Sequence, residues 1–429
     1  MKRVPLRLLL VASMVAAILF PTAAARAGSG FGDVPTSYWA WPAIEYVAIT
    51  NPWMNDYTDG DFHPTTLETR GLLARSLVEM FAPGGVPTPG CAITFTDLAS
   101  TDPLYPYACT AVQLGWMVRF ASGAFAPNGP IMLENFDRAV VLALGLTAPV
   151  QGLASIHTTA GYRYAVSPWF PYLQLGRTLG LHYDHANAAL DLEATSFMPR
   201  DETAFGLWRA KTLPPWILAE TSAFDSVVLP ALNPADPTQL AKQQLTQFAL
   251  RYVGYPYVWA GEWYRKTPPT YCCGYQPVGG FDCSGFVWWV LKLQGEQGWS
   301  NAGIRPYPGW SLPQRTSYDM AKATTVKIPY ARLRVGDILM FADSGTRTWQ
   351  NIDHVGIYLG NGWMIHSVGS VTTPLDPNAV YSDGPQLEYI GDPANWYRQS
   401  FAWGRRLIVA TGPAPSPSPS PSPPPSPSP

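Results

Sequence analysis

The sequence predicts a multidomain protein with a mainly α-helical N-terminal half and an α+β C-terminal half. Two observations predict this division. Between Gly30 and Lys211 a Phe-x-Pro turn recurs three times, each copy flanked by apolar residues at helical spacing. After residue 237, an apolar helical run is followed by short apolar segments around a Gly-Asn-Gly turn, the pattern of antiparallel strands. A length of 429 residues agrees with two or three domains.

The composition excludes several classes of protein. Hydrophobic residues make up 47% of the chain and charged residues only 14%, so there is ample material for packed cores. The formal net charge is -2, and the chain therefore lacks the basic surplus that nucleic-acid binding requires. After the first 27 residues no run is long and apolar enough to span a bilayer. A DNA-binding protein, a disordered chain and a multi-span membrane protein are excluded.

The N-terminus, residues 1–27, has the pattern of a secretion signal. Basic residues open the chain, an apolar run follows over 8–20, and Ala25-Arg26-Ala27 fits the small-x-small cleavage rule. We predict cleavage after Ala27, so that the mature protein is secreted and stays associated with the cell wall or cell surface. An uncleaved N-terminal anchor is the alternative.

The cysteine count is odd, which leaves at least one free thiol in an exported protein. The five cysteines are Cys91, Cys109, Cys272, Cys273 and Cys283. Cys91 and Cys109 lie close enough in one region to pair, whereas the state of the adjacent Cys272 and Cys273 stays open. His182 and His185 flank Asp184, which we interpret as a polar surface turn rather than a metal site. We predict no metal and no cofactor.

We divide the mature chain into six parts. Three repeats cover 28–90, 91–150 and 151–212, a Pro-rich linker covers 213–237, a catalytic-looking domain covers 238–411, and a disordered Pro/Ser tail covers 412–429. The three turns that mark the repeats are Phe62-His63-Pro64, Phe125-Ala126-Pro127 and Phe197-Met198-Pro199. One helix–loop–helix unit cannot bury its apolar stripe alone, but three packed together can.

The first repeat resembles an S-layer homology repeat, and the other two are more degenerate copies. The resemblance is carried by Phe31-Gly32-Asp33-Val34-Pro35, Tyr38-Trp39-Ala40, Asp59-Gly60-Asp61-Phe62-His63-Pro64 and Thr69-Arg70. It implies binding to anionic secondary polymers of the bacterial cell wall through an arginine at a helix start, here Arg70 and Arg200. The usual Ala and Glu after that arginine are replaced by Gly71 and Leu72, and the second repeat has no arginine there. The alternative is that both are ordinary solvated helix residues.

The candidate nucleophile is Cys283. The segment Phe281-Asp282-Cys283-Ser284-Gly285 leads into a continuous apolar run, which predicts a buried helix with Cys283 at its N-terminal end. The positive end of a helix and a nearby imidazolium both lower the pKa of a thiol, and the free amides there can hold an oxyanion. A buried structural cysteine is the alternative.

Two histidines on neighbouring predicted strands supply the remaining chemistry. His354 opens one strand, His366 lies in the next, and Gly360-Asn361-Gly362 separates them. A three-residue turn would pair Leu359 with Trp363 and place His354 and His366 diagonally on one face, within side-chain reach. A two-residue turn would put them on opposite faces, so we predict the three-residue turn.

The C-terminal half resembles the NlpC-type family of papain-like peptidoglycan endopeptidases. The matching segments are Tyr257-Val258-Trp259, Asp282-Cys283-Ser284-Gly285-Phe286, Leu312-Pro313-Gln314-Arg315-Thr316, Gly336-Asp337, His354-Val355-Gly356-Ile357-Tyr358-Leu359-Gly360 and Met364-Ile365-His366. The resemblance implies Cys283 as nucleophile, His354 as base and His366 as the residue that orients it. It also implies substrate contacts by Tyr257, to which we add Asp282 and Ser284. Two departures are Ala260, where the family usually has Gly, and the long loop 262–280.

The resemblance implies an exported cysteine peptidase that hydrolyses peptidoglycan stem peptides next to D-glutamate, often before diaminopimelate. The expected partners are those stem peptides and, through the repeats, a secondary wall polymer. Two alternatives stay open. One is a non-catalytic wall-binding or structural protein, and the other is an amidase or acyltransferase on the same fold, because a thioester can be captured by another acceptor.

Overall fold

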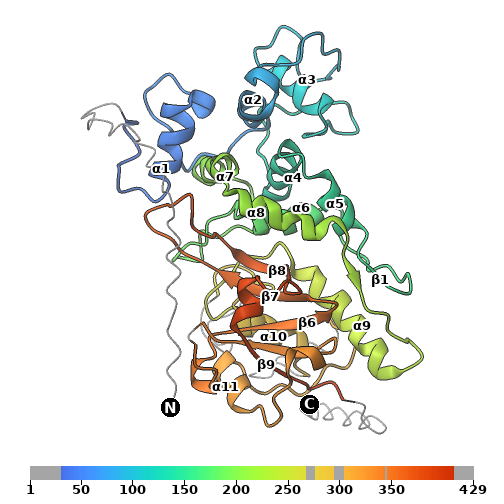
Figure 1. Cartoon of the computed structure of the whole chain (residues 1–429). Helices are drawn as coiled ribbons and strands as arrows, with labels where there is room; N and C mark the ends of the chain where they lie inside the picture. The colour runs from blue at the N-terminus through green and yellow to red at the C-terminus, as the bar shows by residue number, and fades with distance from the viewer. Residues whose placement is uncertain (1–29, 267–275, 294–303, 344, 410–429) are drawn as a thin grey trace, which may run out of the picture.

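The computed structural model describes residues 30–266, 276–293, 304–343 and 345–409. The predicted signal, the predicted tail and the pair Cys272 and Cys273 lie outside these residues. Helices from the first half of the chain form the upper part of the molecule, and a sheet with its helices forms the lower part (Figure 1). In the described ranges, no helix is both long and apolar enough to cross a membrane.

The upper part is built from short helices whose apolar faces meet in one core. Their bounds are α1 Trp41–Ile44, a π-helix Glu45–Thr50, a 3-10 helix Pro52–Met54, α2 Arg70–Phe81, a 3-10 helix Pro83–Gly85, α3 Tyr105–Gln113, α4 Leu133–Ala143, α5 Thr147–Ala154, α6 Phe170–Leu179 and α7 Arg200–Thr212. One long helix from each repeat, α2, α4 or α7, follows a Phe-x-Pro segment, directly for α7 and after residues 65–69 and 128–132 for α2 and α4. None of these units could bury its stripe alone, because each helix is too short to be stable without tertiary packing.

The three repeats close into a ring through the first amides of α2, α4 and α7. Arg70 N–H donates to Gly129 O, Leu133 N–H to Ser196 O, and Arg200 N–H to Thr66 O, each at 2.9 Å. The first turn of a helix has no internal acceptor for these donors. The loop around each Phe-x-Pro turn therefore accepts a hydrogen bond from the helix start of another repeat. The second repeat accepts from the first, the third from the second, and the first from the third.

A disulfide joins Cys91 to Cys109, with the two Cα atoms 6.0 Å apart. The pairing that the sequence left possible is therefore present. It connects the loop before α3 to the middle of that helix, and Tyr105 of the same helix donates a hydrogen bond to Ile93 O at 2.9 Å. Together the two contacts hold a loop that contains no helix of its own.

The segment predicted as a linker, residues 213–237, is folded. It contains α8 Pro215–Glu220, a 3-10 helix Thr221–Asp225 and β2 Val228–Leu229. Strand β2 pairs in parallel with β1, His157–Thr158, from the third repeat. Phe224 also packs against Trp363 of the lower sheet, with ring centroids 5.4 Å apart. The connection therefore contacts both halves of the molecule.

The lower part is an antiparallel five-stranded sheet in the order β8-β7-β6-β5-β9. The strands are β5 Ile338–Phe341, β6 His354–Gly360, β7 Trp363–Gly369, β8 Asp383–Tyr389 and β9 Phe401–Arg405. A small hairpin pairs β3 Glu262–Trp263 with β4 Gly280–Phe281. The helices are α9 Pro237–Ala249, α10 Cys283–Leu291, α11 Ser317–Lys322 and α12 Trp396–Ser400, and α10 packs against β6 and β7. Three 3-10 helices complete it: Leu250–Tyr252, Tyr330–Arg332 and Trp349–Asn351.

The turn between β6 and β7 differs from the prediction. Gly360 pairs with Trp363, so the turn has two residues, Asn361 and Gly362, and the three-residue turn is wrong. A bulge at Leu359 then restores the predicted register, since Ile357 pairs with Ile365. Asn361 and Gly362 both have positive φ, which a tight hairpin turn of this kind requires. The extra residue of the bulge keeps both histidines on one face.

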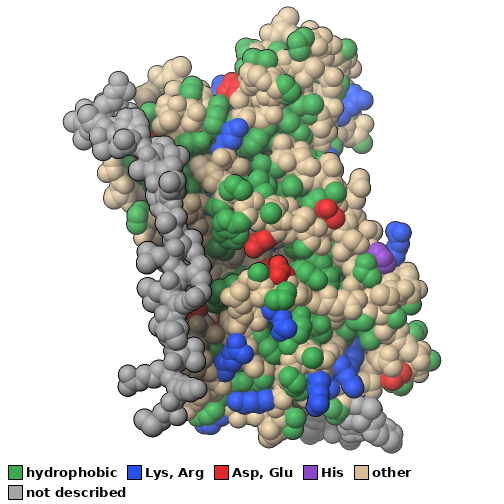
Figure 2. Space-filling model, in the orientation of Figure 1, with side chains coloured by type: hydrophobic (Ala, Val, Ile, Leu, Met, Phe, Trp, Pro, Cys, Tyr) green, Lys and Arg blue, Asp and Glu red, His purple; other side chains and the backbone are tan. Residues whose placement is uncertain are grey.

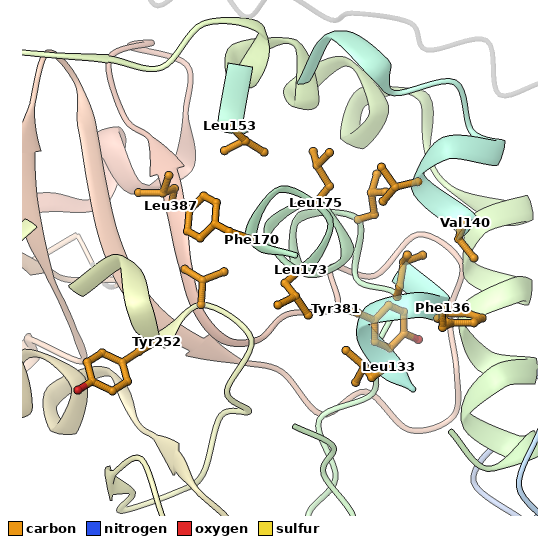
Figure 3. Packing of buried hydrophobic residues seen from close by; sticks show 14 of the residues in the cluster. Leu133, Phe136, Val140, Leu153, Phe170, Leu173, Leu175, Tyr252, Tyr381 and Leu387 are labelled. Atoms are coloured by element: carbon orange, nitrogen blue, oxygen red, sulfur yellow. The ribbon is translucent and has the colours of Figure 1, made fainter. Parts of the chain in front are cut away.

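The two halves share a continuous buried core. Figure 3 shows Leu133 and Phe136 of the second repeat and Phe170 and Leu173 of the third in the same layer as Tyr381. Polar contacts cross the same boundary. The Gln174 side chain donates to Leu387 O at 3.0 Å and accepts from Leu387 N–H at 2.7 Å, so it covers the open edge of β8 as another strand would.

Candidate active site

Cys283 is the first residue of α10, and its side chain is partly accessible at the surface. Asp282 caps the helix by accepting from Gly285 N–H at 2.6 Å. The amides of the first helical turn have no internal acceptor, so the Cys283 N–H is available to an oxyanion. The Cys283 Sγ lies 3.9 Å from Asp353 O, the carbonyl directly before His354. The sheet therefore brings the backbone of His354 against the sulfur.

The two histidines contact each other as the register requires. His354 Nε2 lies 2.8 Å from His366 Nδ1, and the rings are nearly perpendicular at 82°. His354 is partly exposed, whereas His366 is completely buried behind it. One ring nitrogen of His354 is thus bound to His366, which fixes the orientation of the ring and leaves the other nitrogen for chemistry.

The electrostatics of the site differ from the prediction. Burial, and to a smaller extent the nearby Asp282 charge, raise the pKa of the Cys283 thiol, which the amides of Val355 and Ser284 lower; the net value is about 12. Burial also lowers the pKa of His354 to about 4, with a small opposing contribution from Asp282. The expectation that the helix end makes this thiol acidic is wrong for this structure, because the loss of solvent outweighs the helix amides. The resting pair is a neutral thiol and a neutral imidazole.

Tyr257 lies between the thiol and the third repeat. Its backbone N–H donates to Asp383 Oδ1 at 2.5 Å, which fixes the segment at the start of β8. Burial raises the pKa of its phenol far above the ordinary value, and the charges of Cys283, Asp282 and Asp184 act in the same direction. The phenol therefore stays protonated and can donate a hydrogen bond toward a group bound at Cys283.

Asp282 and Ser284 belong to a buried polar network beneath α10. The Arg315 guanidinium donates to Asp282 Oδ2 at 2.9 Å, to Ser284 Oγ at 2.9 Å and to Glu262 Oε2 at 2.5 Å. Ser284 Oγ also donates to Asp282 Oδ1 at 3.0 Å. Substrate contact by these two side chains stays a prediction, and in this structure their polar atoms are bound under the helix. Their part is to hold the start of α10 in place.

The sequence analysis missed Tyr397. This residue of α12 packs against both imidazoles, with ring centroids 5.5 Å from His354 and 4.7 Å from His366. Burial raises the pKa of the Tyr397 phenol well above its usual value, and the charges of Glu388 and Cys283 act in the same direction. No sequence signal could have found it, because it lies 31 residues beyond His366 in an unremarkable aromatic segment.

Arg70 and Arg200, predicted to bind a wall polymer, are buried, with 6% and 0% of their surface exposed. Arg200 donates to Phe62 O at 2.9 Å and to the Asp56 carboxylate at 2.7 Å. Arg70 donates to Phe125 O at 2.7 Å. The polymer-binding prediction for these two residues is wrong, and so is the alternative of solvated helix residues. Each guanidinium instead joins its own helix to the Phe-x-Pro turn of another repeat.

His182, Asp184 and His185 do not form a surface turn, because all three are buried. The two histidines bind different carboxylates: His182 Nε2 lies 2.8 Å from Asp137 Oδ1, and His185 Nε2 lies 2.5 Å from Glu202 Oε1. Asp184 reaches the lower domain, since a side chain at Gly369 would collide with both its carboxylate and the ring of Tyr257. The third repeat therefore contributes a carboxylate next to the candidate site.

Two further observations concern the neighbourhood of the site and possible metal ligands. Ala260 has a φ of 60°, which favours glycine and explains why this position usually carries Gly in the family that the sequence resembles. The loop 262–280 lies partly outside the described residues. Within the described residues, Asp59, Asp61 and His63 form a group close enough to hold a cation, but the His63 ring is already bound to Asp59 at 2.8 Å.

Comparison with known families finds a matching segment in each half of the chain. Residues 254–386 match the NlpC/P60 family, and residues 94–131 match the S-layer homology domain. The chain therefore carries an NlpC/P60 domain behind an S-layer homology region, as the two sequence resemblances indicated.

Curated relatives match part of the chain. The bifunctional muramidase/DL-endopeptidase CwlT of Bacillus subtilis is 37% identical over 28% of this chain and 27% of its own length. The gamma-D-glutamyl-L-lysine dipeptidyl-peptidase of the same organism is 32% identical over 29% of this chain and 31% of its own length. The chain thus spans less than a third of either relative. A crystal structure of an NlpC/P60 family protein from Bacillus cereus is 25% identical, covers 39% of this chain and 41% of that one, and gives a TM-score of 0.26.

Proposed function

We propose that the protein is a secreted, wall-associated cysteine endopeptidase that hydrolyses peptidoglycan stem peptides. The observation that carries the proposal is one arrangement of three side chains. A partly accessible thiol begins a helix beside the backbone of His354, and the His354 ring is hydrogen-bonded to the buried His366 at 2.8 Å. A cysteine, an imidazole and a third polar group that orients it are the parts of a thiol acyl-transfer site.

In the proposed mechanism, the Cys283 sulfur attacks the scissile carbonyl while its proton moves to the free nitrogen of His354. The developing oxyanion is held by the Cys283 N–H, with Tyr257 available as a second donor. His354 then donates the proton to the leaving amine, and a thioester forms on Cys283. Water, deprotonated by His354, hydrolyses the thioester and regenerates the thiol.

The neutral resting state affects the first step. With a thiol pKa of about 12 and an imidazole pKa of about 4, a preformed thiolate–imidazolium pair is strongly disfavoured in this structure. Proton transfer is therefore coupled to attack, when the negative charge passes to an oxygen that the helix amides can stabilise. His366 supports this step because an imidazole partner orients His354 without adding a charge.

We further infer that the scissile bond follows D-glutamate in the stem peptide, as in a D-glutamyl-diaminopimelate bond. The printed names of two relatives, a DL-endopeptidase and a gamma-D-glutamyl-L-lysine dipeptidyl-peptidase, support this substrate class. The test is to incubate murein with the protein and with Cys283→Ala, and to read new peptide ends by mass spectrometry. Cys283→Ser serves as the matched control of similar size and polarity.

We expect new ends from the unsubstituted protein and about none from Cys283→Ala. Equal product from both would eliminate Cys283 as the nucleophile. No product from either, with folding verified, would favour the non-catalytic wall-binding alternative. Products that carry an added amine rather than water would favour the acyltransferase alternative.

The repeats are proposed to tether the enzyme to a secondary wall polymer, and the predicted signal 1–27 to direct its export. Because Arg70 and Arg200 are buried, the polymer contact must use other residues. Full-length Cys283→Ala protein should bind isolated walls and lose that binding once the secondary polymers are stripped. Undiminished binding after stripping would contradict the tether, whatever the outcome of the peptidase test.

A further inference from the structure

A pocket lies at the end of the sheet remote from the thiol. It has a volume of about 650 Å³, within the range of about 300–1,000 Å³ that small-molecule sites occupy. It is lined by the start of α9, the loop before β5, the turn after β6 and the segment that follows β9. Strand β6 runs from His354 to Gly360, so this pocket is roughly 20 Å from the histidine at the other end.

Lys242 is the most unusual residue in this pocket. Only 8% of its surface is exposed, yet it lines the cavity, and the described residues record no hydrogen bond or ion pair for its ammonium group. The ammonium nitrogen itself is not excluded from solvent, so the stem of Lys242 is buried while its charge opens into the cavity. Burial lowers the Lys242 pKa, Asp337 opposes this, and the positive charges of Arg406 and Arg334 lower it again.

The two nearby carboxylates are already occupied. Asp337 accepts from Arg406 Nε at 2.8 Å, from a second Arg406 nitrogen at 2.7 Å and from Arg334 N–H at 2.8 Å. Asp236 accepts from the first amides of α9 and from the Gln239 side chain at 2.9 Å. Neither carboxylate forms an ion pair with Lys242, although the charges of both favour its protonated form. The exposed Arg334 guanidinium adds a second positive charge on the cavity wall.

The wider surface has the same sign. Figure 2 shows Lys and Arg side chains gathered over the lower part of this face, where the NlpC/P60 domain lies. Positive charge on this part of the surface favours the approach of an anion at long range.

We propose that this pocket is a binding site for a phosphate-bearing ligand, held by Lys242 and Arg334. An ammonium supplies a point charge to one phosphate oxygen, and a guanidinium supplies directed donors to the others. The volume exceeds what a bare phosphate needs, so the cavity has room for a sugar- or glycerol-sized group attached to it. The proposal does not depend on the peptidase chemistry, because the pocket is at the other end of β6.

Full-length Cys283→Ala protein is titrated by calorimetry with inorganic phosphate, glycerol 3-phosphate and a glycerol-phosphate oligomer, with neutral glycerol as the ligand control. We expect phosphate-dependent binding that Lys242→Met and Arg334→Gln each weaken at least about tenfold, as the loss of a charge-assisted hydrogen bond predicts. Arg163→Gln removes an exposed arginine of the repeats and should leave the affinity unchanged.

Tighter binding of the oligomer would identify a wall-polymer phosphodiester as the ligand, and binding of the small phosphates alone would identify a free phosphorylated molecule. Arg334 is exposed, so Arg334→Gln decides the question even where Lys242→Met fails to fold. The proposal is overturned by absence of phosphate binding to the parent protein, or by equal affinity in the parent and Arg334→Gln.

Discussion

His185 in the third repeat and His354 in the NlpC/P60 domain are both surrounded by protein, yet their pKa values move in opposite directions. Burial lowers the pKa of His185, but the hydrogen bond and charge of Glu202 outweigh burial and raise it overall. For His354, burial lowers the pKa to about 4, because its partner is the neutral ring of His366. The partner, and not the burial, decides which histidine stays available as a base.

The same contrast extends to the carboxylates. The third repeat buries several acids with few cations near them, and burial raises the pKa of Asp184 to about 7 and of Asp191 to about 9. Under α10, the Arg315 guanidinium compensates Asp282 and Glu262 directly. Buried carboxyls of the third repeat thus keep protons at neutral pH. The carboxylates under α10 instead form ion pairs with Arg315, and these pairs position the nucleophile.

The largest expected effect follows from replacing the proposed base. His354→Gln keeps a polar side chain but cannot accept a proton, so we expect peptidase activity to fall about 10²- to 10⁴-fold. The measurement is the initial rate on a muropeptide substrate. His157→Gln, in the third repeat, is the matched control and should change the rate little. A His354→Gln rate within a few-fold of the parent would contradict the assignment.

A carboxylate in place of His366 would give His354 the kind of partner that His185 has. His366→Asp should raise the pKa of His354 by roughly 1–3 units. His354 must be neutral to act as a base, so the acid limb of the kcat/KM profile should move to higher pH. His366→Asn retains a hydrogen-bonding side chain without charge and should leave the limb near its parental position. Identical limbs for Asp and Asn would show that partner charge does not control this histidine.

The raised pKa of Asp191 predicts a pH dependence of stability. Between the ordinary aspartate pKa of 3.8 and about 9, the folded state holds a proton that the unfolded state has lost. Stability should therefore fall as the pH rises through this window, by up to about 1.4 kcal/mol per pH unit.

The measurement is urea unfolding from pH 6 to pH 9. Asp191→Asn should flatten the slope, whatever its effect on stability at any one pH. Asp225→Asn, which alters an exposed carboxyl, should keep the parental slope. An unchanged slope in Asp191→Asn would mean that this carboxyl is ionised in the folded protein.

The smallest effect is expected for Glu202→Gln. The raised pKa of His185 contributes stability below the unfolded value of 6.5, which is lost as the pH rises through the folded pKa. Burial also raises the pKa of Glu202, so this group too contributes stability that is lost as the pH rises. Without the carboxylate, a buried His185 loses its proton on folding. The deficit of the variant should thus be greater at pH 5.5 than at pH 8, by about 1 kcal/mol, as measured by urea unfolding.

Much of the site could be predicted from local sequence. The apolar run that follows Asp282-Cys283 predicted a buried helix with Cys283 at its N-terminal end, and Cys283 is the first residue of α10. The histidines were placed on one face from strand alternation, although the turn length that justified it was wrong and a bulge at Leu359 supplied the missing residue. Local patterns could not show that Asp282 and Ser284 are bound by Arg315, because that arginine is distant in sequence and its partner Glu262 lies in another hairpin.

Neighbours along the chain are enough to set the order of the parts, the helix start at Cys283 and the alternation that aligns His354 with His366. Tertiary structure decided what long-range packing controls. It buried Arg70 and Arg200 between repeats, placed Tyr397 on the imidazoles and removed enough water to keep the thiol protonated. Protonation and accessibility depend on everything that surrounds a group in space, and no local pattern contains that information.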